Sequence, residues 1–171
     1  LAEGLINQQG KADFNSEAFK ASRDDLHLHP SSLLNPMPGL VMHVEGFIND
    51  FKGEKKPELE QALAGVGTPQ SGGATVVRKS LGLKTGDALG ANQAKAAVLG
   101  AMMTPLRQGQ VGSCFATAPC VKARATDPVG VMNDLAGIVK TGTLAKGGLP
   151  AVPVVSNIAA NEDPLLRGWE Y

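Results

Sequence analysis

The chain has 171 residues, 43% of them hydrophobic and few of them aromatic, which is enough for one domain with a core of Ala, Leu and Val. Its 16 Lys and Arg balance 16 Asp and Glu, so the overall charge does not favour a nucleic acid or an anionic membrane as a partner. No apolar run approaches the roughly 20 residues that a membrane span needs, and we predict no span.

The sequence of the N-terminal region predicts secondary structure more clearly than it predicts a functional site. Residues 1–21 predict one or two short helices, because their apolar residues recur at loose helical spacing. Further on, Asp25, His27 and His29 would share one face of an extended segment before Pro30. Such a group could bind zinc or iron, but three ligands so close together usually need a fourth from elsewhere. We therefore predict no metal site and no cofactor, and interpret the stretch as the polar face of a strand.

The middle of the chain alternates helical and loop-like segments. Residues 57–63 predict a helix with Pro in its first turn. Residues 65–73 are rich in Gly, Ser and Thr and predict a flexible loop, which lacks the closing Gly-Lys-Ser/Thr of a phosphate loop. Residues 75–77 predict a short strand. Residues 91–103 consist of good helix formers with an apolar face and predict a helix.

The residues that most suggest chemistry are 107–116, Arg-Gln-Gly-Gln-Val-Gly-Ser-Cys-Phe-Ala. The two glycines allow a tight loop that other groups can approach closely. Ser113 is a good N-cap, and the residues after it predict a helix, so Cys114 would lie at a helix N-terminus. There the helix dipole favours the thiolate, which makes Cys114 a candidate nucleophile. Cys120 would lie on a different face of this helix, so we predict no disulfide between the two.

This stretch resembles the nucleophile segment of the papain-like cysteine peptidases, whose motif is Gln-Gly-x-x-Gly-Ser-Cys-aromatic-Ala. Residues 108–116 match the motif without a gap. In that family the Gln side chain and the backbone N–H of the Cys donate hydrogen bonds to the oxyanion of the tetrahedral intermediate. The resemblance implies these roles for Gln108 and Cys114. It also implies a peptide or protein substrate and amide hydrolysis through an acyl-enzyme on Cys114.

The chain departs from the family in three respects. Val111 stands where the family usually has a disulfide-forming Cys. Pro119 falls within the helix that follows the nucleophile and predicts a kink there. The family also needs a His and then an Asn roughly a hundred residues or more after the Cys, whereas residues 115–171 contain no His. We therefore expect the His and Asn to come from further C-terminal polypeptide or from a second chain.

Two helices and a short strand are predicted after the candidate nucleophile. Residues 114–125 and 129–139 have helical spacing, with a break between them at Asp127-Pro128. The second helix is predicted to end at Lys140-Thr141-Gly142. A loop of small residues follows. Residues 152–155 predict an extended segment whose Pro suits an edge strand.

The predicted fold class is α+β, mainly the helical lobe of a papain-like fold that is incomplete without further polypeptide. Residues 96–171 would form the nucleophile-bearing part of this domain. Residues 1–95 would be an N-terminal extension or a propeptide-like region.

Other interpretations stay open. The chain could be a catalytically inactive binding or scaffold protein on a degenerate papain-like fold, as the missing downstream His suggests. The intact Gln108 and Cys114 oppose this alternative. A further alternative is that an upstream His (His27, His29 or His43) serves Cys114, although the sequence around these residues resembles no such peptidase.

Overall fold

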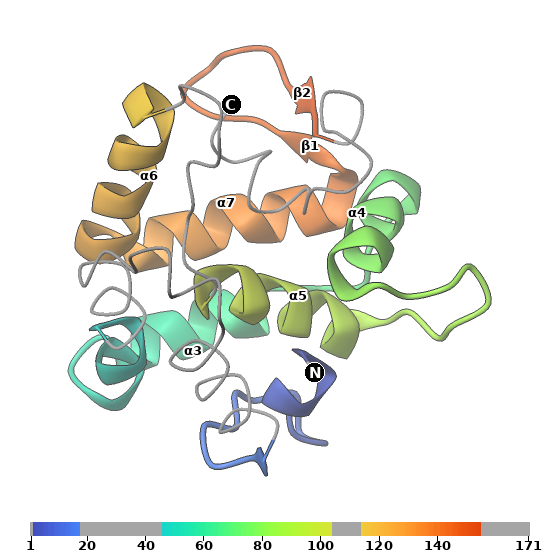
Figure 1. Ribbon diagram of the computed structural model, residues 1–171, viewed down its shortest axis with the longest axis horizontal. Helices are drawn as coiled ribbons and strands as arrows, with labels where there is room; N and C mark the ends of the chain where they lie inside the picture. The colour runs from blue at the N-terminus through green and yellow to red at the C-terminus, as the bar shows by residue number, and fades with distance from the viewer. Residues whose placement is uncertain (1, 18–45, 104–113, 155–171) are drawn as a thin grey trace, which may run out of the picture.

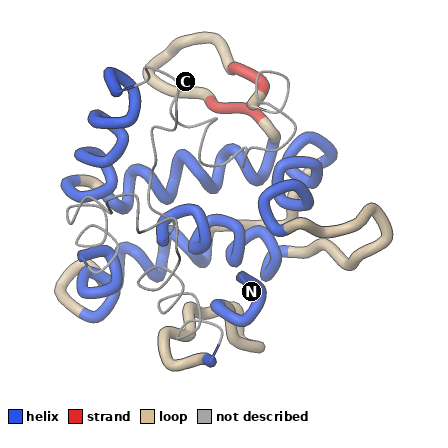
Figure 2. Tube along the Cα trace, in the orientation of Figure 1, coloured by secondary structure: helices blue, strands red, loops and turns tan. Residues whose placement is uncertain are grey.

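The computed structural model describes residues 2–17, 46–103 and 114–154, and most of these residues are helical (Figure 1). One antiparallel two-stranded sheet accompanies them, so the prediction of a mainly helical α+β fold is confirmed (Figure 2). The named elements are η1 (Ala2–Leu5), α3 (Lys56–Ala64), α4 (Ser71–Leu81), α5 (Ala91–Met103), α6 (Cys114–Thr126), α7 (Pro128–Thr141), β1 (Thr143–Leu144) and β2 (Val152–Pro153). Residues 46–52 are also helical.

Helix α7 is the centre of the packing and contacts α3, α4, α5 and α6. Its apolar residues recur at helical spacing, and five of them are at most 2% exposed. These are Val131, Met132, Leu135, Ile138 and Val139. The helix ends where the sequence predicts, because Gly142 adopts a left-handed φ of 81° that favours glycine. This helix therefore supplies much of the apolar core.

Helix α5 has the bounds that the sequence predicts, and many of the residues that it buries are small. Ala94, Ala96 and Val98 are fully buried, which fits the expected core of Ala, Leu and Val. Small residues let neighbouring helices approach closely without leaving cavities. The predicted boundary between residues 95 and 96 lies inside this helix, and the buried residues on both sides of it belong to one hydrophobic cluster.

Helix α4 corrects the predicted strand over 75–77 and the last three residues of the predicted loop over 65–73, while residues 65–70 are a loop as predicted. The helix begins at Ser71 and continues through this β-branched stretch, of which Val76 and Val77 are fully buried. Glycine and β-branched residues are poor helix formers, which is why the sequence suggested otherwise. Tertiary packing outweighs this preference, because α4 packs along α7 and the side chains of both valines enter the shared core.

Two glycines let the start of α4 lie directly on the backbone of α7. A Cβ atom on Gly73 would overlap the carbonyl oxygen of Val139, and one on Gly72 would overlap that of Thr141. Next to them, the backbone N–H of Gln70 donates to the carbonyl of Lys140 at 2.8 Å. Glycine is therefore required here for close approach.

The N-terminal segment packs against α5 and residues 46–52. Leu5 is 3% exposed, and the ring of Phe14 meets that of Phe51 edge-on with 5.1 Å between centroids. The Lys95 ammonium on α5 donates to the carbonyl of Gly10 at 3.3 Å. Of the short helices predicted over residues 1–21, the described part contains the single turn η1, and Glu17 is helical as well.

The two-stranded sheet follows α7 directly. Thr143 lies opposite Pro153 and Leu144 opposite Val152, which agrees with the predicted extended segment that includes a Pro. The loop between the strands is exposed, and the Lys146 ammonium binds the carboxylate of Asp134 on α7 at 2.5 Å. This ion pair connects the loop to the central helix.

Candidate functional site

Cys114 is the first residue of helix α6, as the sequence predicts. The first four backbone N–H groups of an α-helix have no partner within the helix, and the dipole places partial positive charge at this end. Both features stabilise a negative charge at the start of a helix, including that of a thiolate. The backbone of Cys114 is therefore in a position suited to a nucleophilic thiol.

The other predicted site residues lie outside the described residues. Gln108 belongs to the stretch that connects α5 to α6, and His27, His29 and His43 precede residue 46. Asp25 precedes it as well. The proposed pairing of Gln108 with the Cys114 backbone N–H thus stays a prediction, as do the alternatives that use an upstream His.

Helix α6 continues through Pro119, which is exposed. Proline has no N–H, so it cannot form the usual hydrogen bond to the carbonyl of Phe115, four residues earlier. The turn that contains Cys114 is therefore joined to the rest of α6 by fewer hydrogen bonds than in a regular helix. The predicted kink at this proline stays a prediction.

The C-terminal half of α6 is anchored by two buried side chains, one helical turn apart. From Ala118 onward, Cys120 is 7% exposed and Arg124 is 1% exposed, while Lys122 faces solvent. Arg124 is the one charged residue that is buried in the described part of the chain. Its Nη1 donates a hydrogen bond of 2.7 Å to the carbonyl of Ala101.

The carbonyl that Arg124 binds belongs to the last turn of α5. The last four carbonyls of a helix lack partners within it, and the negative end of the dipole lies there. The guanidinium of Arg124 thus satisfies a helix-terminal acceptor and also places a positive charge where the dipole favours one. Since α5 and α6 flank residues 104–113, Arg124 joins the two helices between which the predicted Gln108 loop runs.

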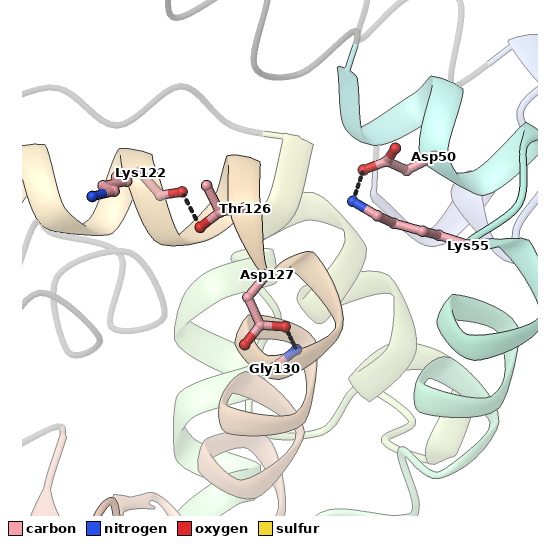
Figure 3. Close-up of polar contacts among 6 residues, drawn as sticks. All are labelled: Asp50, Lys55, Lys122, Thr126, Asp127 and Gly130. Atoms are coloured by element: carbon pink, nitrogen blue, oxygen red, sulfur yellow. Dashed lines mark hydrogen bonds and ion pairs between the residues drawn. The ribbon is translucent and has the colours of Figure 1, made fainter.

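The junction of α6 with α7 is a single residue, Asp127 (Figure 3). Its Oδ1 accepts a hydrogen bond from the backbone N–H of Gly130 at 2.9 Å and caps α7. On the other side of the junction, the Thr126 hydroxyl donates to the carbonyl of Lys122 at 2.9 Å within the last turn of α6. The end of α6 and the start of α7 therefore each have a side-chain hydrogen bond at this junction.

Sequence reasoning missed Arg124. Arg124 lies four residues after Cys120, so the two side chains share one face of the helix. The sequence alone does not show that this face is buried. An arginine in a surface helix is ordinarily solvated, however. Its burial depends on the end of α5, which the local sequence does not locate.

Within residues 2–17, 46–103 and 114–154, no three His, Cys, Asp or Glu residues come together as potential metal ligands. Over the same ranges, no helix is long and apolar enough to cross a membrane.

Comparison with known proteins adds no relative. No family model matches the chain, no curated protein matches its sequence, and no solved structure matches its fold.

Proposed function

We propose that the chain is the nucleophile-bearing part of a papain-like cysteine peptidase, with Cys114 as the nucleophile. The observation that carries the proposal is that α6 begins at Cys114, within the stretch 108–116 that matches the family motif. A motif match alone would leave the thiol in an unknown environment. A helix start supplies the physical reason for a reactive thiolate.

In the proposed reaction, the Cys114 thiolate attacks the carbonyl carbon of the scissile amide, and a C–S bond forms. The negative charge moves to the carbonyl oxygen, where the Cys114 N–H and the Gln108 side-chain amide would donate hydrogen bonds. The C–N bond then breaks, and the amine leaves with a proton from a general acid, which produces a thioester on Cys114. Water hydrolyses this thioester and restores the thiol.

The general acid and base of this reaction require an imidazole. Because residues 115–171 contain no His, we propose that the His and its Asn partner are supplied by further C-terminal polypeptide or by a second chain. A papain-like helical lobe that presents Cys114 toward this partner is the fold we propose for the domain. The substrate would be a peptide or a protein.

The competing proposal is an inactive binding or scaffold protein on a degenerate form of the same fold. The lack of a His after Cys114 favours it, and so does Pro119, which interrupts the hydrogen bonding of the nucleophile helix. In that case Cys114 would behave as an ordinary thiol.

The two proposals differ in the acidity of Cys114, which alkylation measures. We would treat the protein with iodoacetamide from about pH 5 to about pH 9 and quantify both cysteines by mass spectrometry. The buried Cys120 is the internal control. The experiment would be run on this chain and on the longest available form of the protein.

For a peptidase, we expect Cys114 of the longer form to react rapidly well below pH ~7, and its Cys114→Ser variant to lose hydrolysis of peptide substrates. An alkylation midpoint near the ordinary thiol value of about 8.5 in both forms would favour the scaffold instead.

A further inference from the structure

Helix α6 needs external contacts to persist. It has 13 residues, a length at which isolated helices are marginal in water, and Pro119 removes one of its internal hydrogen bonds. From Ala118 onward, Cys120 is its one fully buried apolar residue, and Val121 and Ala123 are only partly buried against the core. The folded state of α6 therefore depends strongly on a few tertiary contacts.

The hydrogen bond between Arg124 and α5 is one of these, beside the packing of α6 on α7. Arg124 is 1% exposed, and its Nη1 lies 2.7 Å from the carbonyl oxygen of Ala101. A buried guanidinium is costly unless its hydrogen bonds are made, so α6 can keep Arg124 in place only while it is docked on the end of α5. Helix α6 is therefore expected to lose helical structure when it detaches from α5.

We propose that Arg124 is a positioning residue for Cys114: by binding the last turn of α5 it keeps α6 docked and helical, and so maintains the helix N-terminus at which Cys114 stands. The catalytic meaning of this inference rests on the proposed function, whereas the anchoring of α6 by Arg124 does not. The effect passes through the helix. Cys114 and Arg124 are separated by about 15 Å along the helix axis, which exceeds the screening length of about 8 Å at physiological salt.

The two cysteines of α6 allow both parts of this inference to be measured in one molecule. Cys120 is buried, so its alkylation requires α6 to detach and reports anchoring. Alkylation of Cys114 as a function of pH reports the electrostatic effect of the helix start. The variant is Arg124→Met, which keeps an unbranched stem but removes the guanidinium. The matched control is Lys122→Met, because Lys122 is an exposed cation on the same helix.

In Arg124→Met we expect Cys120 alkylation to accelerate on the order of ten- to a hundredfold, the factor that corresponds to a lost buried hydrogen bond of a charged group. The alkylation midpoint of Cys114 should move up toward about 8.5. Arg124→Lys keeps the charge and should restore part of both effects. Lys122→Met should leave both cysteines as in the wild type.

Unchanged reactivity of both cysteines in Arg124→Met would overturn the inference. If Arg124→Met does not fold, Arg124→Lys is used, and hydrogen exchange of the α7 amides distinguishes detachment of α6 from global unfolding. Loss of α7 protection together with that of α6 in Arg124→Lys would make Arg124 a general determinant of folding and would also overturn it. Ordinary acidity of wild-type Cys114 in both this chain and the longest available form contradicts the proposed peptidase, while the Cys120 result still decides whether Arg124 anchors α6.

Discussion

Helices α6 and α7 are consecutive and nearly equal in length, with 13 and 14 residues, yet they are stabilised in different ways. Helix α7 buries a continuous apolar stripe against four neighbouring helices. The described side chains of α6 that are fully buried are one thiol and one guanidinium, with Val121 and Ala123 partly buried beside them. Each helix contains a proline. Pro128 stands in the first turn of α7, where a missing N–H costs nothing, and Pro119 stands inside α6, where it removes a hydrogen bond.

The comparison indicates that α7 and α6 have different roles in the described part of the chain. The packing around α7 supplies stability that does not depend on any single polar contact. The attachment of α6 depends on few contacts, and this is the helix that begins with the candidate nucleophile. Elements near functional sites are often drawn from the less stable parts of a fold.

The largest effect is expected from a cavity under α7. Leu135 is fully buried at the centre of this helix. Leu135→Ala should lower the free energy of unfolding by about 2–5 kcal/mol, measured by urea denaturation, because it removes apolar contacts and leaves a void. The same change at Leu149, which is 73% exposed, is the control and should alter it by less than about 0.5 kcal/mol. Equal effects at the two positions would refute the central role of α7.

A smaller loss is expected where α4 meets α7. Gly73→Ala would place a methyl group against the carbonyl of Val139, and the two helices would have to separate. We expect a loss of about 1–3 kcal/mol in the free energy of unfolding. Gly137→Ala on the open side of α7 meets no neighbouring atom and should stabilise by about 0.5–1 kcal/mol. Effects of the same sign at both glycines would contradict the close approach of α4 and α7.

The smallest effect is expected at the junction of the two compared helices. Asp127→Ala removes the side-chain cap of α7 and should cost about 1 kcal/mol in thermal or chemical unfolding. Asp127→Asn keeps an acceptor oxygen at the cap and should retain most of the stability. If Asn were as destabilising as Ala, the hydrogen bond to the Gly130 N–H would not be the source of the effect.

The sequence was informative where local signals decide the structure. The bounds of α5 and the end of α7 follow from strong helix formers and from Gly142, and the start of α6 follows from a cap and a motif. Helix α4 could not be found in this way, because Gly72, Gly73 and the valines after them disfavour a helix until α7 packs against them.

The same distinction between local and long-range signals applies to the two residues of the candidate site. Cys114 could be identified from a short motif and a predicted helix start. Arg124 could not, because its burial depends on its contact with Ala101 in the last turn of α5, 23 residues earlier in the chain. Contacts between segments distant in sequence leave no local pattern from which to predict them.

The single-residue corner at Asp127 has a mechanical consequence. With α7 fixed in the core, α6 resembles a lever about 20 Å long with its pivot at Asp127 and Cys114 at the opposite end. A rotation of only about 5° at the pivot would displace the backbone of Cys114 by about 2 Å. Since a misplacement of about 1 Å can cost an enzyme about a hundredfold in rate, small adjustments at this corner would be strongly amplified at the thiol.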